Sequence, residues 1–184
     1  MRKILGMMLA FMMCAGAAAA TVDKIQVPDT ANVGGHQLVL NGAGLRTKFF
    51  VHVYVGALYL PTPLHTAGAV LAAQGPTRIL MRMEYAASRS QMVDAFNDDF
   101  RNNLSKQEYA AVADRIKTFT SYFGDTHQGT EILIDYLPEI GTRVTIDGKI
   151  KGVIPGAEFQ RAVLLVWLGK DPADSDLKEA MLAQ

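Results

Sequence analysis

Cysteine is almost absent from this chain, because the single cysteine among its 184 residues is Cys14 in the N-terminal segment. The sequence also lacks net charge, since 18 lysines and arginines balance 18 aspartates and glutamates. Without an excess of positive charge there is no sign of the basic surface that nucleic acids require, so we expect no nucleic-acid partner. A chain of this length is suited to one domain with a substantial core.

The motifs of common metal and catalytic sites are missing as well. The chain contains no G-x-S-x-G nucleophile elbow, and its Gly42-Ala43-Gly44 turn precedes a strand rather than a phosphate-binding helix. Histidines are few and widely spaced, without the HxH or HExxH pattern of zinc sites: His36, His52, His65 and His127. We therefore expect no metal and no cofactor.

The first 20 residues have the form of an export signal. Met1-Arg2-Lys3 is positively charged, residues 4–13 are apolar, and Ala18-Ala19-Ala20 provides the small residues after which signal peptidase cuts. The apolar run is shorter than the roughly 20 residues of a transmembrane span. We expect residues 1–20 to be removed, and residues 21–184 to form a single soluble domain that is periplasmic or secreted.

Removal of this segment would change the chemistry of the chain in two ways. The mature protein would carry 16 basic and 18 acidic residues, a net charge of −2, and no cysteine. The bulky residues before Cys14 argue against a lipid anchor at that position. Because an exported protein without cysteine has no disulfide, its stability must come from the hydrophobic core.

The stretch from residue 41 to residue 60 is the most distinctive part of the sequence. Residues 41–48 are polar and glycine-rich and predict a loop, whereas residues 49–60 are rich in Val, Phe and Tyr and predict a long central strand. A strand over residues 36–40 would pair with it as a hairpin. Alternation along the long strand predicts two different faces: Val51, Val53 and Val55 on one, and Phe50, His52 and Tyr54 on the other.

Strands are predicted in clusters rather than in alternation with helices. The sequence also predicts strands over residues 22–27, 77–85, 130–136, 142–146 and 149–154, and helices over residues 66–74, 158–168 and the C-terminal segment. Asp147-Gly148 is the clearest hairpin signal in the chain. The order of elements favours the α+β class, with an antiparallel sheet and helices layered on one face.

A helical hairpin is predicted between residues 88 and 123. Ser88 with Gln91, and Ser105 with Glu108, have the spacing of capping boxes at helix N-termini. Apolar side chains then recur at helical spacing and are expected in the core: Met92, Val93, Phe96, Phe100, Leu104, Val112, Ile116, Phe119 and Phe123. The charged residues between them, Asp94, Asp98, Asp99 and Arg101, are expected to form a solvated face.

Arg46 is the main candidate for a binding residue. A glycine-rich loop that carries an arginine to the edge of an apolar strand can present a bidentate fork to a carboxylate or an enolate oxygen. Tyr54 could donate its hydroxyl to the same anion, and His52 is predicted on the same face. The alternatives are a surface salt bridge for Arg46 and an ordinary core position for Tyr54.

A family resemblance covers most of residues 37–182. The motif Gly42-Ala43-Gly44-Leu45-Arg46, followed by Val55-Gly56-Ala57-Leu58-Tyr59-Leu60, resembles the chalcone isomerase superfamily. The C-terminal hairpin at Asp147-Gly148 and the later segment Leu168-Gly169-Lys170 also resemble this superfamily. More narrowly, the chain is similar to bacterial, exported chalcone isomerase-like proteins. The resemblance implies an open-faced β-sandwich, in which helices pack on a large antiparallel sheet beside a cleft.

The same resemblance suggests what Arg46 does. In plant enzymes of the superfamily the corresponding arginine polarises a carbonyl while a phenolate closes a chalcone to a flavanone. The other polar positions carried over from those enzymes hold no comparable donor here: Val53, Met92, Asp99 and Val166. Related proteins bind fatty acids without catalysis, through an arginine and a tyrosine, and Arg46 with Tyr54 suits that role better.

Three hypotheses about function follow. The first is a non-catalytic binder of a small amphipathic anion such as a fatty acid, in a cleft next to Arg46 with Tyr54 and His52. The second is an isomerase, an intramolecular lyase of the chalcone isomerase type with Arg46 as its catalytic residue. The third is an interaction module with a relic cleft. The first two differ in the polar groups that catalysis would need around Arg46.

Overall fold

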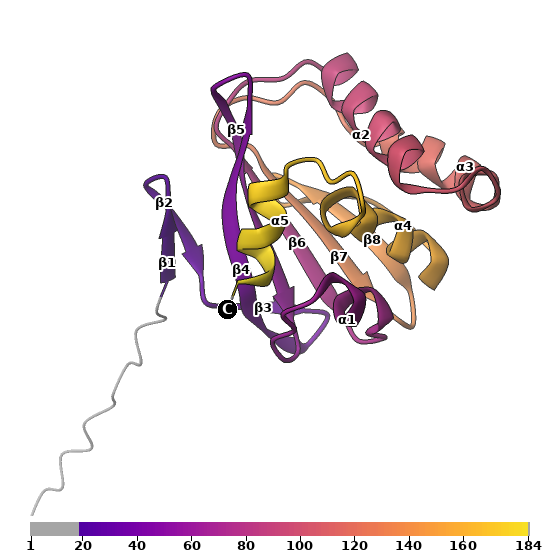
Figure 1. Cartoon of the computed structure of the whole chain (residues 1–184), viewed down its shortest axis with the longest axis horizontal. Helices are drawn as coiled ribbons and strands as arrows, with labels where there is room; N and C mark the ends of the chain where they lie inside the picture. The colour runs from indigo at the N-terminus through magenta and orange to yellow at the C-terminus, as the bar shows by residue number, and fades with distance from the viewer. Residues whose placement is uncertain (1–18, 184) are drawn as a thin grey trace, which may run out of the picture.

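The computed structural model describes residues 19–183, and a seven-stranded antiparallel sheet forms its centre (Figure 1). Each strand pairs with the next one along the chain, so the strand order in space is the order in sequence. The strands are β3 (Thr30–Val33), β4 (His36–Lys48), β5 (Val51–Leu60), β6 (Thr77–Met83), β7 (Glu131–Leu137), β8 (Gly141–Ile146) and β9 (Lys149–Ile154). The α+β class with a large antiparallel sheet is confirmed.

Five helices accompany the strands in residues 19–183. They are α1 (Ala67–Ala72), α2 (Arg89–Asn103), α3 (Lys106–Ser121), α4 (Ala157–Leu168) and α5 (Ser175–Leu182). Figure 1 shows α1, α4 and α5 across one face of the sheet, with the α2 and α3 hairpin beyond α4. Both predicted capping boxes are present, at Ser88 and at Ser105, because each serine and the residue three positions later satisfy each other's backbone amides.

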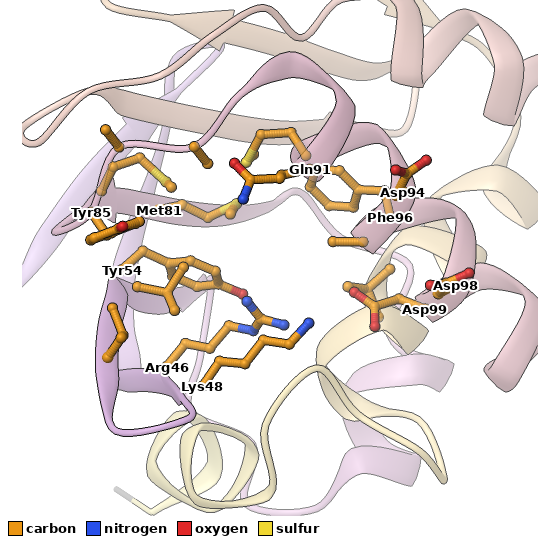
Figure 2. A pocket seen from close by; sticks show the side chains of 18 of the residues that line it. Arg46, Lys48, Tyr54, Met81, Tyr85, Gln91, Asp94, Phe96, Asp98 and Asp99 are labelled. Atoms are coloured by element: carbon orange, nitrogen blue, oxygen red, sulfur yellow. The ribbon is translucent and has the colours of Figure 1, made fainter.

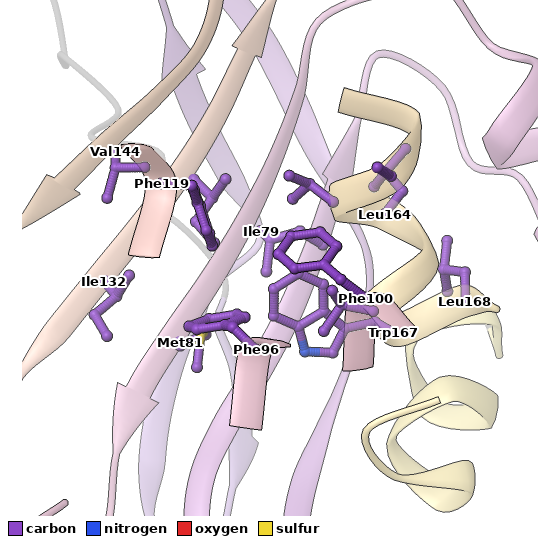
Figure 3. Packing of buried hydrophobic residues seen from close by; sticks show 14 of the residues in the cluster. Ile79, Met81, Phe96, Phe100, Phe119, Ile132, Val144, Leu164, Trp167 and Leu168 are labelled. Carbon is purple, nitrogen blue, oxygen red and sulfur yellow. The ribbon is translucent and has the colours of Figure 1, made fainter. Parts of the chain in front are cut away.

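The face of the sheet under the helices holds the larger hydrophobic core. Alternate residues of the strands point into it, including Leu58, Ile79 and Met81, and meet apolar side chains from the helices (Figure 3). Aromatic rings connect the helices to one another, and those of Phe96 on α2 and Phe119 on α3 pack edge to face with centroids 5.1 Å apart. The helical spacing of apolar residues therefore predicted the core side of α2 and α3 correctly, except for Val93, which lies in neither hydrophobic core.

The opposite face of the sheet is covered in part by an N-terminal hairpin of β1 (Ala19–Val22) and β2 (Ile25–Pro28). The prediction of a single strand over residues 22–27 was wrong. The chain turns back at Asp23 and Lys24, which both adopt positive φ without the Gly or Asn that usually announces such a turn. The short strand β3 was also not predicted.

The predicted loop over residues 41–48 is instead part of β4, which runs without interruption to Lys48. Its glycines serve helix packing rather than a turn. A Cβ added at Gly42 would overlap the backbone of α5 at Ala180, and one at Gly44 would lie 2.6 Å from the Ala180 Cβ. The strand needs glycines without side chains at these positions because α5 lies directly on it.

Asn41 ties this part of β4 to two distant segments. Its buried amide donates to the carbonyls of Leu64 and Met181, at 3.0 and 2.7 Å, and its side-chain oxygen accepts from the Leu64 amide at 2.7 Å. These bonds satisfy the polar atoms that burial would otherwise leave unpaired. They fix the end of α5 and the segment after β5 against the sheet.

A β-bulge in β5 changes the predicted faces of this strand. Arg46 pairs with Tyr54 and Thr47 with His52, so Val53 is an extra residue on β5. The alternation predicted for residues 50–55 was therefore wrong, because Val53 lies on the helix side together with Tyr54. The turn before the bulge consists of Phe49 and Phe50 alone, both with positive φ.

Candidate functional site

A pocket of about 510 Å³ opens between α2 and the end of the β4 and β5 hairpin. Figure 2 shows its layout, with Arg46 and Lys48 extending from one wall toward Asp98 and Asp99 on α2. Volumes of about 300–1,000 Å³ are typical of small-molecule sites. The remaining lining is mostly apolar and includes Val53, Met81, Met83, Met92, Phe96 and Val166.

Arg46 reaches the pocket from β4 and is held in place by two contacts. Its Nε donates to the Ala173 carbonyl at 3.2 Å, and its guanidinium carbon lies 5.6 Å from the centre of the Tyr54 ring. Among residues 19–183, no carboxylate forms a salt bridge with Arg46, and its two Nη groups make no hydrogen bond to the protein. The guanidinium fork is therefore oriented and still open to a ligand. The alternative role for Arg46, a surface salt bridge, does not occur in this part of the chain.

Tyr54 lies beside Arg46 at the buried side of the pocket. Its hydroxyl oxygen accepts a hydrogen bond of 2.8 Å from the Trp167 indole. Burial raises the pKa of Tyr54 to about 12, so the phenol keeps its proton at neutral pH. Because the oxygen already accepts from Trp167, the hydroxyl hydrogen is available to an acceptor in the pocket, next to the Arg46 fork (Figure 2).

Trp167 is a site residue that the sequence prediction missed. It is 1% exposed and orients the Tyr54 hydroxyl from α4. The sequence offers only a weak signal for it, namely that the single tryptophan of the chain follows Val166, a position that the family resemblance had already marked.

Three carboxylates face the two cations across the pocket. Asp94 and Asp98 are exposed at its lip, whereas Asp99 is half-buried. Desolvation raises the pKa of Asp99 to about 6, despite the opposing attraction of Arg46. The prediction of a solvated face holds for Asp94, Asp98 and Arg101, which are exposed. It was wrong for Asp99, which α2 places half-buried in the pocket, facing Arg46 and Lys48.

His52 does not belong to this pocket. It lies on the other side of β5, where its Nδ1 is 2.5 Å from Asp23 Oδ2 in the turn of the N-terminal hairpin. The bulge at Val53 is the reason, since it places Tyr54 and His52 on opposite faces. Of the three predicted binding residues, the structure brings Arg46 and Tyr54 together and separates His52 from them.

The positions carried over from the family resemblance converge on this pocket. Val53, Met92, Asp99 and Val166 all line it together with Arg46. Only Asp99 is polar, and it is a carboxylate that lies across the pocket from the arginine. The site can bind an apolar body and hold an anionic group at Arg46 and Tyr54, but it offers few donors to orient a second polar group.

A known family matches the whole of the described chain. Residues 19–183 match the family described as chalcone isomerase-like. The chain belongs to the chalcone isomerase-like family. No curated protein matches it in sequence. Within this family fold, the pocket occupies the space between the sheet and α2.

A solved structure shows the same fold. The crystal structure of a fatty-acid binding protein from Arabidopsis thaliana is similar to this chain, with a TM-score of 0.65 and 16% identity. The match covers 90% of this chain and 96% of the plant chain. At this identity, the likeness concerns the fold of the two proteins.

Residues 19–183 contain neither a membrane-spanning helix nor a cluster of metal ligands. No helix there is both long and apolar enough to cross a membrane. No group of three or more His, Cys, Asp or Glu side chains in the same residues is arranged to hold a metal ion.

Proposed function

We propose that this chalcone isomerase-like protein binds a fatty acid or a similar amphipathic anion without converting it. The observation that carries the proposal is the meeting of two donors, the free Arg46 fork and the Tyr54 hydroxyl, at the buried side of an apolar pocket. Charge-assisted, bidentate hydrogen bonds are the strong ones, and a carboxylate suits this pair of donors. The methionines and Phe96 would cover the hydrocarbon chain.

The fatty-acid binding protein from Arabidopsis thaliana adds support of a different kind. It has the same fold, and it is a fatty-acid binding protein, so its ligands belong to the chemical class that this pocket fits. The flexible methionine side chains of the pocket, at Met81, Met83 and Met92, can adapt to chains of different length.

An isomerase function is supported less well by the same residues. Arg46 can polarise a carbonyl, but Val53, Met92 and Val166 provide no hydrogen bond that would hold a phenolate near it. Each positioned donor of this kind is worth roughly 10²–10³ in rate. A binding role needs no such group.

We also propose that the protein is exported. The support is the N-terminal sequence, with its charged start, apolar stretch and alanine-rich site before Thr21. Ala19 and Ala20 form half of β1, so cleavage before Thr21 would leave Thr21 and Val22 to pair with β2. An exported binder would meet its amphiphile outside the cytoplasm.

Calorimetric titration with dodecanoate tests the binding proposal. Arg46→Ala is expected to lower affinity about ten- to a hundredfold, because a hydrogen bond to a charged group is worth ~1.5–3 kcal/mol. Arg46→Lys should lose nearly as much, since lysine keeps the charge but not the fork. Tyr54→Phe should lose less, and the double variant should be less than additive if both donors contact one group.

Arg161→Ala provides a control with the same change in net charge, because Arg161 is half exposed on α4 outside this pocket. It should bind dodecanoate as the wild type does. Equal affinity of the wild type and a folded Arg46→Ala variant would contradict the proposal. In that case Arg46 would be structural, and the interaction module would become the better hypothesis.

A further inference from the structure

The turn between β4 and β5 exposes two phenylalanines almost completely to solvent. Phe49 is 86% exposed and Phe50 is 100% exposed, and neither belongs to either hydrophobic core. Large apolar side chains at a hairpin tip contribute nothing to the stability of this fold, because they remain in water after folding.

The backbone of this turn is also unfavourable for phenylalanine. Phe49 and Phe50 have φ of 49° and 65°, a left-handed conformation in which a side chain with a Cβ is strained. The β8 and β9 turn has nearly the same geometry, with φ of 47° and 73°, and uses Asp147 and Gly148, a preferred pair for it. The protein thus uses the preferred residue pair in the β8 and β9 hairpin and two aromatic residues in the β4 and β5 hairpin.

The tip adjoins the mouth of the pocket described above. Lys48, Phe49 and Val51 line the pocket from the turn, and Tyr85, which is 54% exposed, lines it from the segment after β6. Apolar side chains therefore extend continuously from the exposed tip into the binding site. An amphiphile entering the pocket would pass along them.

The turn itself carries positive charge, and the carboxylates of α2 face it across the pocket. From Arg46 to His52 the sequence contains two permanent cations and no carboxylate, although the whole chain has no net charge. Lys48 is exposed and its ammonium lies 5.9 Å from the centre of the Phe49 ring. A lysine beside exposed aromatic rings is suited to the interface of a membrane that contains anionic lipid.

We propose that the Phe49 and Phe50 tip inserts into the interface of a lipid bilayer and thereby places the mouth of the pocket against the membrane surface. The occupant we infer is a bilayer rather than a protein. The two phenylalanines form a small protruding tip rather than a broad apolar surface, and this tip leads into a pocket for an amphiphile. A bilayer is also the reservoir from which such a ligand would come. Docking itself does not depend on the ligand, so it can hold even if the proposed function fails.

Flotation with phosphatidylcholine vesicles, with and without phosphatidylglycerol, tests this directly. The wild type should float with the mixed vesicles. The Phe49→Asn and Phe50→Gly double variant should bind at least roughly tenfold more weakly, since burying even one Phe is worth about that factor. This variant carries the preferred turn residues, so it should unfold at a higher temperature than the wild type although it binds vesicles more weakly.

A matched control removes two exposed apolar side chains elsewhere. Ile140 is 53% exposed in the turn at the opposite end of the sheet, and Val153 is 41% exposed on the edge strand β9. The Ile140→Ser and Val153→Ser double variant should float like the wild type. Phe50→Gly alone should float weakly but bind monomeric decanesulfonate normally, because Phe50 does not line the pocket.

Phe50→Trp reports the insertion itself. Its emission should shift to the blue on vesicle binding and be quenched by brominated phosphatidylcholine, whereas the buried Trp167 should not respond. A wild type that does not float, or a Phe49→Asn and Phe50→Gly variant that floats equally well, would overturn the proposal. So would a dimer of the wild type in lipid-free buffer that the double variant cannot form, because the tip would then bind a second copy of the protein.

Discussion

Asp99 is the residue whose chemistry most affects what Arg46 can bind. It faces Arg46 and Lys48 across the pocket without touching either within salt-bridge distance, and its pKa is raised to about 6. A ligand anion at Arg46 would gain from the two cations and be repelled by Asp99. At the residue scale, the pocket therefore favours anions most when this carboxyl group is protonated.

Binding of an anion should consequently tighten as the pH falls from about 7.5 to about 5. We expect a gain of roughly three- to tenfold, because charges facing each other across a partly hydrated pocket interact by on the order of 1 kcal/mol. Tyr54 does not contribute over this range, since burial holds its pKa at about 12. Titrations with decanesulfonate measure the effect, because a sulfonate stays anionic where a fatty acid would itself gain a proton.

Asp99→Asn should bind decanesulfonate more tightly at pH 7.5 and lose most of the pH dependence. Asp114→Asn is the matched control, because Asp114 is exposed on α3 outside the pocket. The stability of the fold should also increase as the pH falls. Folding raises the pKa of Asp99 from 3.8 to about 6, so this group contributes stability in full below pH 3.8 and loses that contribution as the pH rises through about 6. A pH dependence unchanged in Asp99→Asn would rule out this residue as its source.

The contact between β4 and α5 positions the site at the scale of elements. Gly42, Gly44 and Gly56 leave the sheet without side chains under α5, and the segment before this helix accepts the Arg46 Nε hydrogen bond at Ala173. Asp174, the N-cap of α5, accepts from the Thr47 amide as well at 2.9 Å. The helix thus holds both the backbone and the side chain at the pocket end of β4.

Gly42→Ala should displace α5 and disturb the site that it supports. We expect a loss of about 1–3 kcal/mol in stability, because the added methyl group would overlap backbone atoms rather than a flexible side chain. Dodecanoate affinity should fall with it, since Arg46 would lose its fixed orientation. Chemical denaturation and calorimetry measure the two effects.

Gly68→Ala is the control for this prediction. Gly68 lies in α1 in open space, so alanine there should leave stability unchanged or raise it slightly. If Gly42→Ala were as stable as the wild type, α5 would have to shift easily. The glycines of β4 would then have no role in positioning the helix.

At the scale of the whole molecule, a chalcone isomerase-like fold surrounds a pocket with one oriented arginine and few other donors. We expect no measurable acceleration of chalcone cyclisation at neutral pH, because Arg46 alone cannot position the phenolate. Absorbance assays with purified protein and a hydroxychalcone measure the rate against the uncatalysed reaction. Saturable cyclisation that Arg46→Ala abolishes would show that the remaining groups suffice for catalysis.

The export proposal predicts a mature N-terminus at Thr21. Cleavage after Ala20 removes the alanine-rich site and Cys14, so the intact mass of the exported protein should match residues 21–184. A species that retains Cys14 with added lipid mass would contradict this prediction. A full-length species that is never processed would contradict it as well.

Local patterns in the sequence determined much of this protein. The capping boxes at Ser88 and Ser105, the Asp147-Gly148 turn and the apolar spacing of α2 were all predicted correctly. Each depends on residues within a few positions of one another, so the signal and the structure lie in the same segment. The motif around Arg46 pointed to the family by the same kind of local evidence.

Only the tertiary structure decided the surroundings of the site. The glycines near Arg46 suggested a loop, but they lie in a strand because α5, some 140 positions later in the chain, packs on them. A single bulged residue, Val53, moved His52 away from Tyr54. Asp99 became a pocket residue through the position of α2 over the sheet. The contacts that decide the roles of the glycines and of Asp99 join segments far apart in sequence, where local patterns carry no information about which side chains will meet. The bulge depends on how β5 pairs with β4, which the alternation along β5 alone does not show.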